Sequence, residues 1–407
     1  MKYDFVIVGA GVGGLYLAYL LEKKGVSYVI LEANSRHGGR IQTVFRDHAT
    51  FELGAARLLS SHTLALELVH SFNIELEEMV IDDAAVHWDG NWNSSLNELL
   101  SAEDYPDPMD LFSDFLRQHE IGSVEEFERL APKTWDTLYT KDWLAELGVP
   151  ASYAKRYFLG DIDVELQQIS LYESLYFYLS NLAHPEAKIF RTKGGLTQLA
   201  DALAHQVNDP IYQEKVIGIY PTEQGLEVLT HSRTYFAQRV VCTCSLTALG
   251  NIELPIEAKT RVQEWLQVGH YGKSVKGIVH LSKAVFPNHN YLLTEDPIRL
   301  LRRSQELWEL YLPSLNKGWT PQTLQDRLTA LFKHDQVALV HFQDYDVAPF
   351  YGCYWNYSFG GFHRIFEAGS TFELTPGIVS VGEHFSMNPN WIEGTLVSVS
   401  NYSKTIQ

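Results

Sequence analysis

The first forty residues alternate short apolar runs with apolar positions at helical spacing. A run at residues 5–8 ends in glycine, and apolar residues then recur every three or four positions from Leu15 to Leu21. A second run, at residues 28–31, ends at Glu32. Runs of four apolar residues are typical of buried strands, whereas the longer recurrence is typical of a helix with one buried face. The pattern predicts a strand, a tight turn, a helix and a second strand.

The turn between this strand and this helix carries glycines in the order G-x-G-x-x-G. Gly9 permits the sharp turn, Gly11 lets a pyrophosphate approach the backbone, and Gly14 lets helix and strand pack closely. The helix N-terminus offers N–H groups to the diphosphate, and an acid about 20 residues further on accepts hydrogen bonds from a ribose. A glycine-rich turn without a ligand is the alternative, but the flanking elements favour a bound dinucleotide. The residues assigned to it are Gly9, Gly11, Gly13, Gly14, Glu32 and Ala33.

The middle of the chain changes character. Residues 41–51 alternate apolar and polar side chains, which predicts a hairpin. From residue 62 to about 186, apolar residues recur at helical spacing, so a mostly helical insertion is expected. Aromatic residues at such spacing are more often core than pocket. Those that lie close together here are Tyr172, Tyr176, Phe177 and Tyr178.

The second half of the chain mixes both patterns. Thr320 and Pro321 are suited to the N-cap and the first position of a helix. The elements expected here are a helix ending at Ala204, short strands within residues 211–243, a strand at residues 276–281, a helix at residues 321–333 and a last helix from about Gly394.

These elements predict an α/β fold of two interwoven domains. The first is a Rossmann-like nucleotide-binding domain with a parallel sheet, made of residues 1–60, 187–250 and 351–407. The second is a mixed substrate-binding domain that carries the helical insertion, made of residues 61–186 and 251–350.

Composition and charge narrow the possible partners. The 407 residues include 50 acidic and 32 basic side chains, a formal charge of −18, which repels nucleic-acid phosphates. The apolar runs are too short to span a bilayer, and the first strand leaves no room for a secretory signal. The three cysteines, Cys242, Cys244 and Cys353, make structural disulfides improbable. A cytoplasmic protein without a metal site is expected, and a homodimer is one option for its assembly.

The segment after Glu32 indicates which dinucleotide is bound. Arg36-His37-Gly38-Gly39-Arg40 resembles the R-x-G-G-R segment of the flavin-containing amine oxidases, a family that includes L-amino-acid oxidases. In that family the second arginine contacts the diphosphate, and two glycines with an arginine suit such close approach. The resemblance implies FAD rather than NAD. It assigns to the cofactor Arg36, Gly39 and Arg40.

The C-terminal part resembles the same family. Residues 379–398 are similar to its signature from G-E-H to W-x-E-G, in which the acid, here Glu383, bonds the ribityl chain. The resemblance also implies a helix whose N-terminal amides point at the flavin, and a valine, Val216, beside the adenine. An amide dipole of this kind would favour hydride acceptance. The further cofactor residues implied here are Gly382, Glu393, Gly394 and Thr395.

Two aromatic residues match the family's walls around the flavin. Trp391 precedes the last helix, and Gly352-Cys353-Tyr354 resembles the G-C-Y of monoamine oxidases, where the tyrosine forms the other wall. In those enzymes the cysteine can be bonded covalently to the flavin. For Cys353, a buried thiol beside non-covalent FAD is preferred, and the covalent link is the alternative.

The substrate is indicated by one arginine and one lysine. Residues 52–58 resemble the E-L-G-A-x-R segment of L-amino-acid oxidases, in which the arginine, here Arg57, binds the substrate α-carboxylate. A guanidinium fork suits a carboxylate, although a structural or cofactor partner for Arg57 is the alternative. Lys276 is similar to the family's lysine that holds a water beside flavin N5, against the alternative of a solvated strand lysine. Gly54, Ala55 and Ala56 are assigned to the cofactor.

The sequence thus suggests a FAD-dependent L-amino-acid oxidase, similar to compact bacterial enzymes such as the L-tryptophan oxidases. It would pass a hydride from the α-carbon of an L-amino acid, aromatic side chains included, to flavin N5, and O2 would then give H2O2. A monoamine or polyamine oxidase, a carotenoid-type desaturase and a non-catalytic FAD-binding subunit are the alternatives.

Overall fold

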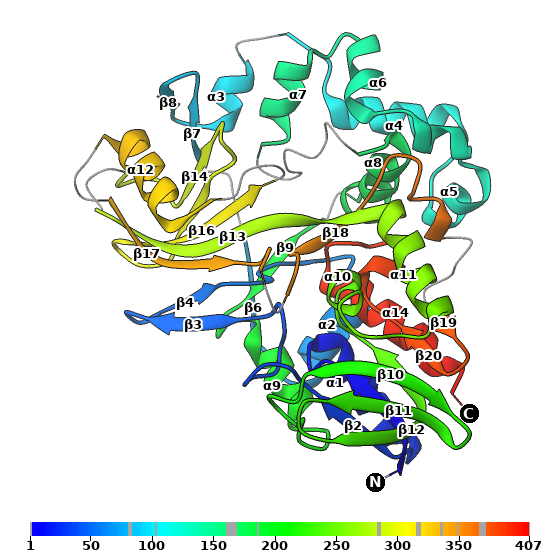
Figure 1. Ribbon diagram of the computed structural model, residues 1–407. Helices are drawn as coiled ribbons and strands as arrows, with labels where there is room; N and C mark the ends of the chain where they lie inside the picture. Colours follow the sequence, from blue (N-terminus) through cyan, green and yellow to red (C-terminus); the bar gives the residue numbers. More distant parts are fainter. Residues whose placement is uncertain are drawn as a thin grey trace.

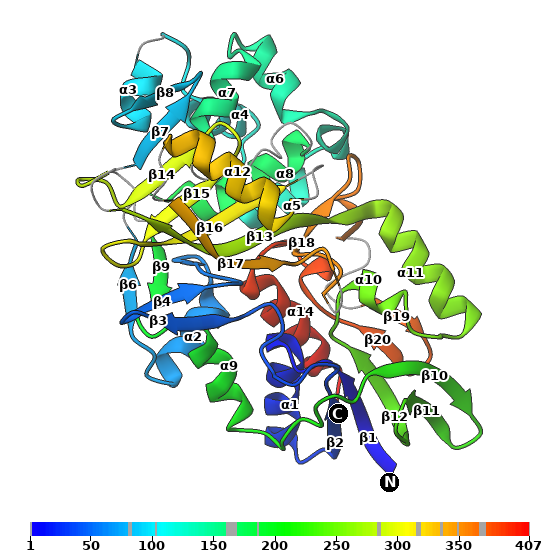
Figure 2. The same cartoon turned by 60° about the vertical axis from the view of Figure 1, so that its left-hand side comes forward.

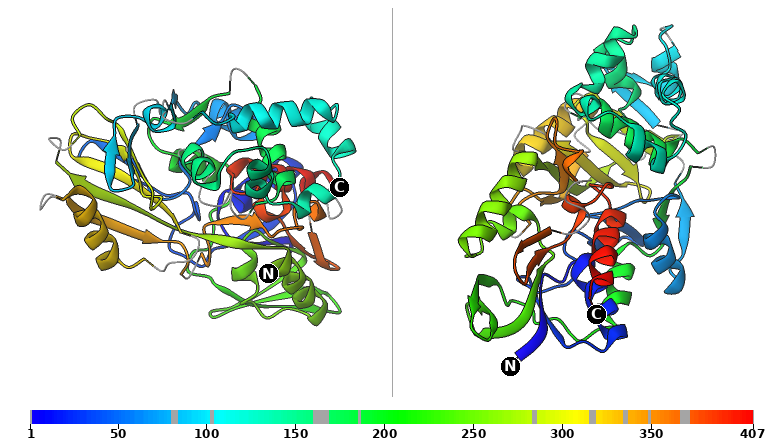
Figure 3. Two further views of the ribbon diagram at one scale, coloured as in Figure 1. Left: turned by 90° about the horizontal axis from the view of Figure 1, so that it is seen from above. Right: turned by 90° about the vertical axis from the view of Figure 1, so that its right-hand side faces the viewer.

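Two large β-sheets lie one after the other along the molecule and contain most of its strands (Figure 1). Both chain termini lie at the end formed by the first sheet (Figures 1 and 3). The computed structural model describes residues 2–79, 84–101, 104–159, 169–184, 187–282, 286–314, 319–333, 337–347, 350–365 and 372–406.

The first sheet has a parallel centre and antiparallel edges. β1 pairs in parallel with β2 and β12, and β12 pairs in parallel with β20. β10 and β11 add an antiparallel meander on the β12 side, and β19 pairs antiparallel with β20. The predicted Rossmann-like parallel sheet is therefore confirmed. Its strands are β1 (Lys2–Val8), β2 (Tyr28–Leu31), β10 (Val216–Thr222), β11 (Gly225–Thr230), β12 (Thr234–Cys242), β19 (Phe372–Thr375) and β20 (Ile378–Ser380).

The first helix begins and ends at glycine. Gly11 is the N-cap of α1, and Gly25 ends it with a φ of +68°, in the left-handed region that favours glycine. Leu15 and Leu21 on this helix are fully buried. α9 and α14 pack on α1, and α2 packs on α14. These helices are α1 (Val12–Lys24), α2 (Thr63–Ser71), α9 (Thr197–Ala204) and α14 (Ile392–Lys404).

The second sheet is mostly antiparallel. The strand order is β17-β13-β16-β15-β14-β7-β8, with β18 paired to one end of β13. α12 packs against β17, and its N-cap Thr320 accepts from the N–H of Thr323, as predicted. The elements are β7 (Ala84–Trp88), β8 (Asn91–Asn93), β13 (Gly269–Leu281), β14 (Tyr291–Thr294), β15 (Arg299–Arg302), β16 (Leu307–Ser314), β17 (Val337–Asp344), β18 (Tyr354–Tyr357) and α12 (Pro321–Phe332).

Short helices cover the end of the molecule farthest from the termini (Figures 1 and 2). The helices not yet named include two 3-10 turns and one π-helical turn, and α10 and α11 lie beside the first sheet. The helices are α3 (Leu96–Ser101), α4 (Pro108–Gln118), α5 (Val124–Leu130), η1 (Lys133–Thr137), α6 (Thr140–Glu146), α7 (Ala151–Tyr157), α8 (Leu171–Phe177), η3 (Tyr178–Leu182), α10 (Leu246–Leu249), α11 (Ile256–Val268) and η4 (Glu383–Phe385).

Two small sheets join the larger parts. The hairpin predicted at residues 41–51 is present as β3 (Thr43–Arg46) and β4 (Ala49–Glu52). A three-stranded sheet contains β5 (Leu58–Leu59), β6 (Leu76–Glu78) and β9 (Ile189–Thr192).

The stretch expected to be mostly helical also contains strands. β6, β7 and β8 lie within it, and β7 pairs in parallel with β14, so that Ala85 faces Leu292. This pairing joins residues about two hundred positions apart in the sequence, so a local sequence pattern could not predict it. The described part of residues 62–186 is mostly helical, as expected, and these three strands are an addition that the sequence did not indicate.

β13 connects the two halves of the molecule. It is 13 residues long, about twice the strand predicted at residues 276–281, because its first four residues pair with β18 and its later residues with β16 and β17. Figure 2 shows it crossing the molecule. The first sheet uses only stretches assigned to the nucleotide-binding domain, whereas β18, from one of these stretches, pairs with the second sheet. The domain boundaries themselves stay a prediction.

Among the described residues, no helix has the length and apolar character needed to cross a membrane. Within the same residues, no cluster of three or more histidine, cysteine, aspartate or glutamate side chains could hold a metal ion.

Candidate functional site

A cavity of about 510 Å³ lies between the first and second sheets. Its walls come from the carboxyl ends of β1 and β2, from β13 and β16 of the second sheet, and from α8 and the start of α14. Ligands of open parallel sheets bind at the carboxyl ends of the strands. The cavity is therefore the candidate site.

The glycine turn forms one end of the cavity. Gly9, with a φ of +107°, and Gly11 line it. Gly14 does not line it, because it packs against the strand, where a Cβ would overlap the carbonyl oxygen of Gly9. The N-cap of α1 has no side-chain hydrogen bond, so the helix N-terminus presents its N–H groups to the cavity. This is the backbone arrangement that suits a pyrophosphate.

Glu32 is fixed at the same end. One carboxylate oxygen accepts from the N–H of Ala10 at 2.7 Å. The other accepts from the N–H and the side-chain amide of Asn34, at 2.9 and 2.8 Å. A carboxylate oxygen can accept more than one hydrogen bond, so Glu32 retains acceptor capacity toward a ribose.

The two arginines of the R-x-G-G-R segment lie differently. The guanidinium of Arg36 donates to the carbonyls of His37, Gly39 and Ile41, within its own loop, and does not line the cavity. Arg40 lines the cavity. Arg36 therefore shapes the loop, although the sequence assigned it to the cofactor.

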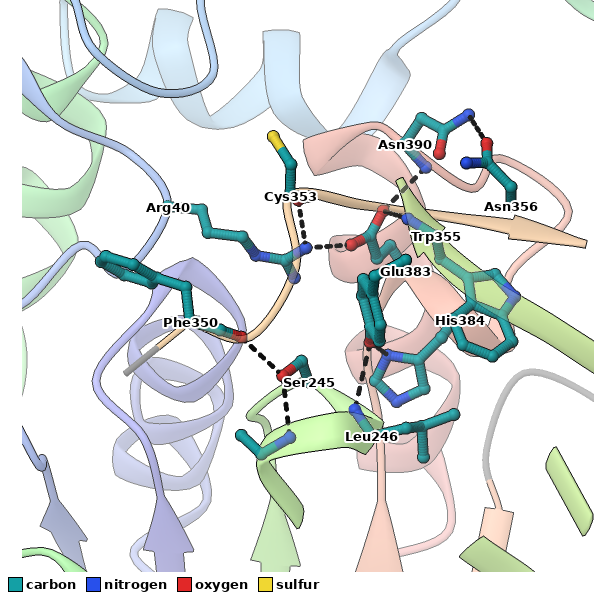
Figure 4. A network of polar contacts seen from close by, with 12 residues as sticks. Arg40, Ser245, Leu246, Phe350, Cys353, Trp355, Asn356, Glu383, His384 and Asn390 are labelled. Atoms are coloured by element: carbon teal, nitrogen blue, oxygen red, sulfur yellow. Dashed lines mark hydrogen bonds and ion pairs between the residues drawn. The ribbon is translucent and has the colours of Figure 1, made fainter. Parts of the chain in front are cut away.

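Arg40 lies at the centre of a polar network that joins the two ends of the chain (Figure 4). Its guanidinium donates to the Cys353 carbonyl at 2.6 Å and forms an ion pair with the Glu383 carboxylate. The other oxygen of Glu383 accepts from the N–H groups of Trp355 and Asn390. The pair thus connects the loop after β2 to the loops around β18 and η4.

A buried histidine extends this network. Burial, together with the charge of Arg40, lowers the pKa of His384 to about 3, so its ring is neutral near pH 7. Its Nδ1 lies 3.0 Å from the hydroxyl of Tyr271, which accepts from the N–H of Leu246. A hydrogen bond therefore links the tyrosine hydroxyl to the neutral ring.

The start of α14 differs in part from what the sequence suggested. Trp391 is the N-cap and Thr395 lines the cavity, but Glu393 and Gly394 do not. The carboxylate of Glu393 accepts from the N–H groups of Leu64 and Ala65, at 3.0 and 2.8 Å, and so caps α2. Its side chain is used to join two helices, which no local motif indicated.

At the other end, the cavity is lined by cationic and aromatic side chains. Lys276 on β13 is buried, and its Nζ lies 4.4 Å from the ring centroid of Tyr311 on β16. Burial lowers the pKa of Lys276, and the charge of Arg57 lowers it further. Arg57 is half-buried, and within the described part of the chain it has neither a hydrogen bond nor an ion pair.

The aromatic walls lie here as well. Tyr354 and Trp391 both line the cavity. The Trp391 ring packs edge-on against the His62 ring, with centroids 4.8 Å apart. His62 accepts from the N–H of Leu59 at 3.1 Å, and burial lowers its pKa to about 3. His62 is thus a neutral support behind the tryptophan.

The structure therefore brings most of the assigned residues to one cavity. Those that do not line it are Gly14, Arg36, Glu393 and Gly394. Those that line it are Gly9, Gly11, Gly13, Glu32, Ala33, Gly39, Arg40, Gly54, Ala55, Ala56, Arg57, Val216, Lys276, Tyr354, Gly382, Glu383, Trp391 and Thr395.

Several lining residues were not found from the sequence. Tyr311 alternates along β16 with the fully buried Leu310 and Leu312. The alternation indicates a face opposite the core, but not what that face meets. Tyr176 and Phe177, expected to be core, line the cavity from α8, as does the buried carboxyl of Glu173.

The residues present fit a flavin dinucleotide. A glycine backbone, an uncapped helix N-terminus and Arg40 lie at one end, and a pocket with aromatic walls and Lys276 lies at the other. The two ends belong to one continuous cavity, which suits a ligand with a diphosphate and a large ring system.

Comparison with known proteins points the same way. The family described as "Flavin containing amine oxidoreductase" matches residues 12–318. An L-amino-acid oxidase of Siganus canaliculatus is 27% identical over 306 residues, which cover 68% of this chain and 56% of that protein. A pseudooxynicotine dehydrogenase of a Pseudomonas species is 23% identical over 312 residues, covering 70% and 60%. The chain thus matches little more than half the length of these curated relatives.

Solved structures share the whole fold. A putrescine oxidase bound to putrescine superimposes with a TM-score of 0.76 at 16% identity, covering 100% of this chain and 99% of that one. Cyclohexylamine oxidase from Brevibacterium oxydans IH-35A gives 0.74 at 18% identity, covering 100% and 99%. At these identities the likeness is one of fold.

Proposed function

Since this chain belongs to the family of flavin containing amine oxidoreductases, we propose that it is a FAD-dependent L-amino-acid oxidase. The observation that carries the proposal is Arg57. This residue lines the cavity, its charge lowers the pKa of Lys276, which lines the same cavity, and among the described residues no carboxylate pairs with it. A cation that faces a binding cavity without an anionic partner is suited to an anionic ligand group.

The substrate carboxylate would be bound by Arg57. Two parallel hydrogen bonds from a guanidinium fork fix the orientation of a carboxylate, and with it the direction in which the α-hydrogen points. Tyr354 and Trp391 would confine the substrate between aromatic walls, and Tyr176 and Phe177 on α8 favour testing aromatic side chains first. Lys276 would hold a water at its ammonium, beside the reacting atoms.

FAD, when bound, supplies the hydride acceptor and its reoxidation by O2. The residues that would hold it are the glycines of the first turn, Glu32, Arg40 and Glu383. In the balanced reaction, an L-amino acid, O2 and water give a 2-oxo acid, ammonia and H2O2. We propose that the flavin is held without a covalent bond, because burial raises the pKa of the Cys353 thiol to about 11.

An amine oxidase that takes substrates without a carboxylate is the second candidate. Glu173 favours it, because this buried carboxyl lines the cavity from α8. In that case a cationic group of the substrate would lie near Glu173, and Arg57 would have another partner.

Anaerobic mixing separates the two candidates. The purified yellow protein would be mixed with L-amino acids, their D-enantiomers and the matching decarboxylated amines, such as L-tryptophan and tryptamine. We expect L-amino acids alone to bleach the flavin absorption band. Bleaching by the amines would assign an amine oxidase. An oxidised spectrum that no compound changes would point to a binding subunit instead.

A further inference from the structure

One face of the second sheet carries a buried carboxylate beside Lys276. In the antiparallel pair of β13 and β16, Lys276 faces Tyr311 and Ile278 faces Glu309. Residues two apart on a strand share a face, so Glu309 lies diagonally across from Lys276, on the same side of the sheet. Glu309 is 6% exposed and does not line the cavity.

The position of Glu309 is fixed by the neighbouring hairpin. One carboxylate oxygen accepts from the backbone N–H of Glu52 on β4 at 2.9 Å. The same oxygen lies 3.8 Å from a guanidinium nitrogen of Arg191 on β9. The carboxylate is thus held between β16, β4 and β9, outside the cavity that Lys276 lines.

Lys276 and Arg57 are two cationic residues that line the same cavity. Few charged or titratable groups surround Lys276 and Glu309. The charged or titratable groups that face Lys276, besides Glu309, are Arg57, Cys353, Glu52 and Tyr311. Those that face Glu309 are Glu52, Arg191, Arg303 and Lys276.

Among these groups, Glu309 is the main support for a charged Lys276. Burial lowers the pKa of Lys276, and the charge of Glu309 is the strongest influence that raises it. Glu52 is the weakest of these influences on Lys276, and burial together with the neighbouring Glu309 raises its own pKa to about 7, which leaves it partly protonated near neutral pH. Glu52 also accepts from the N–H of Leu196 and the hydroxyl of Thr43.

We infer that Glu309 is a positioning residue that acts through Lys276: from its buried position on the same face of the second sheet, without touching any ligand, it keeps the ammonium of Lys276 charged at the end of the cavity that Lys276 and Arg57 line. With Glu309 ionised, Lys276 and Arg57 both present positive charge to the cavity. This favours a carboxylate over a cationic amine, a step that rests on the proposed function.

The test is a pH titration of the flavin absorption in the purified holoprotein, without substrate. In the wild type, loss of the Lys276 proton should perturb the bound flavin in one transition, which Lys276→Met should abolish. Glu309→Gln removes the negative charge but keeps an oxygen for the Glu52 N–H. We expect it to move the transition about one unit lower, a tenfold weaker proton affinity.

Controls separate this effect from general damage. Glu306→Gln removes an exposed carboxylate that pairs with His280 near the start of β16, and it should not move the transition. Glu309→Asp retains the charge, and should restore a wild-type transition even if Glu309→Gln folds poorly. In Lys276→Met, adding Glu309→Gln should leave the spectrum unchanged.

Three results would overturn the inference. The first is a transition in Glu309→Gln at the same pH as in the wild type. The others are a wild type without any transition, and a transition that persists in Lys276→Met. Because the titration contains no substrate, its failure is distinct from that of the proposed reaction. If no amino acid bleaches the flavin, the result of the titration still holds. If the titration fails, the result of the amino-acid panel still holds.

Discussion

The two ends of the cavity are built in opposite ways. At the nucleotide end, charged side chains are paired with protein groups: Glu32 accepts from backbone N–H groups, and Arg40 is bound to Glu383. At the substrate end, Arg57 has neither a hydrogen bond nor an ion pair within the described residues, and Lys276 lies against an aromatic ring. At the first end the charged groups are paired within the protein, whereas at the second end a cationic side chain is available to pair with a ligand. Equivalent changes at the two ends should therefore have different consequences.

Arg40→Ala should have the largest effect. Removing the guanidinium leaves the Glu383 carboxylate buried without its cationic partner, which costs about 3 kcal/mol or more of unfolding free energy. We expect most of the flavin to be lost as well. The ratio of flavin to protein and unfolding in denaturant measure the two effects.

A second variant shows whether the cost arises from the uncompensated charge. Arg40→Ala combined with Glu383→Gln should recover part of the stability, since no buried charge is then unpaired. If Arg40→Ala kept full flavin content and wild-type stability, the nucleotide end would not depend on this pair, and the contrast between the two ends would fail.

Arg57→Ala should have a smaller effect of another kind. Losing a charge-assisted fork to a carboxylate costs about 1.5 to 3 kcal/mol, so the KM for L-amino acids should rise about tenfold to a hundredfold. Flavin content and thermal stability should stay at wild-type values. Steady-state kinetics and flavin absorption measure both.

Arg57→Lys is the matched control for this variant. A lysine keeps the charge but not the planar fork, so it should restore only part of the affinity. Equal losses of substrate affinity and flavin content in Arg57→Ala would instead assign Arg57 to the cofactor.

Acidification should lower the free energy of unfolding through one buried histidine at each end of the cavity, and by similar amounts. His62 supports Trp391 and His384 adjoins Arg40, and burial lowers the pKa of each to about 3. An unfolded histidine has a pKa near 6.5, so below that pH the unfolded state binds more protons and stability falls. By pH 5 this amounts to at most about 2 kcal/mol for each histidine.

The raised pKa of Glu52 has the opposite effect on stability between about pH 4.5 and 7, because the folded state then binds the additional proton. Histidine variants are therefore needed to isolate the contribution of the histidines. Unfolding free energies of the wild type, His62→Gln and His384→Gln would be compared at pH 7 and pH 5. Each variant should lose less stability on acidification than the wild type. An equal loss in all three would mean that neither histidine is held neutral.

The contrast between the ends also explains what the sequence could predict. The nucleotide end is local: strand, glycine turn, helix and Glu32 lie within about thirty residues, and their spacing follows from backbone geometry. The hairpin of β3 and β4 and the N-cap Thr320 were predictable for the same reason.

The substrate end depends on pairings between distant strands. Tyr311 reaches the cavity only because β16 pairs with β13, and Glu309 meets Lys276 only in that register. Resemblance pointed to Lys276 and Arg57, which line the cavity, and to Glu393, which does not line it and whose carboxylate accepts from N–H groups at the start of α2. Side chains used for tertiary contacts carry no local signature.

Cys353→Ala should have the smallest effect, and it tests whether the flavin end needs a covalent bond. The backbone of Cys353 belongs to the network, since its carbonyl accepts from Arg40 and its N–H donates to Gly272. Alanine preserves both contacts. Burial raises the pKa of the thiol to about 11, so at pH 7 only about one molecule in ten thousand carries the nucleophilic thiolate. Acid precipitation should therefore release the yellow flavin from the wild-type protein, and Cys353→Ala should keep wild-type flavin content. A pellet that stays yellow in the wild type and turns white in Cys353→Ala would establish a thioether, and the flavin would then be held by more than the fold.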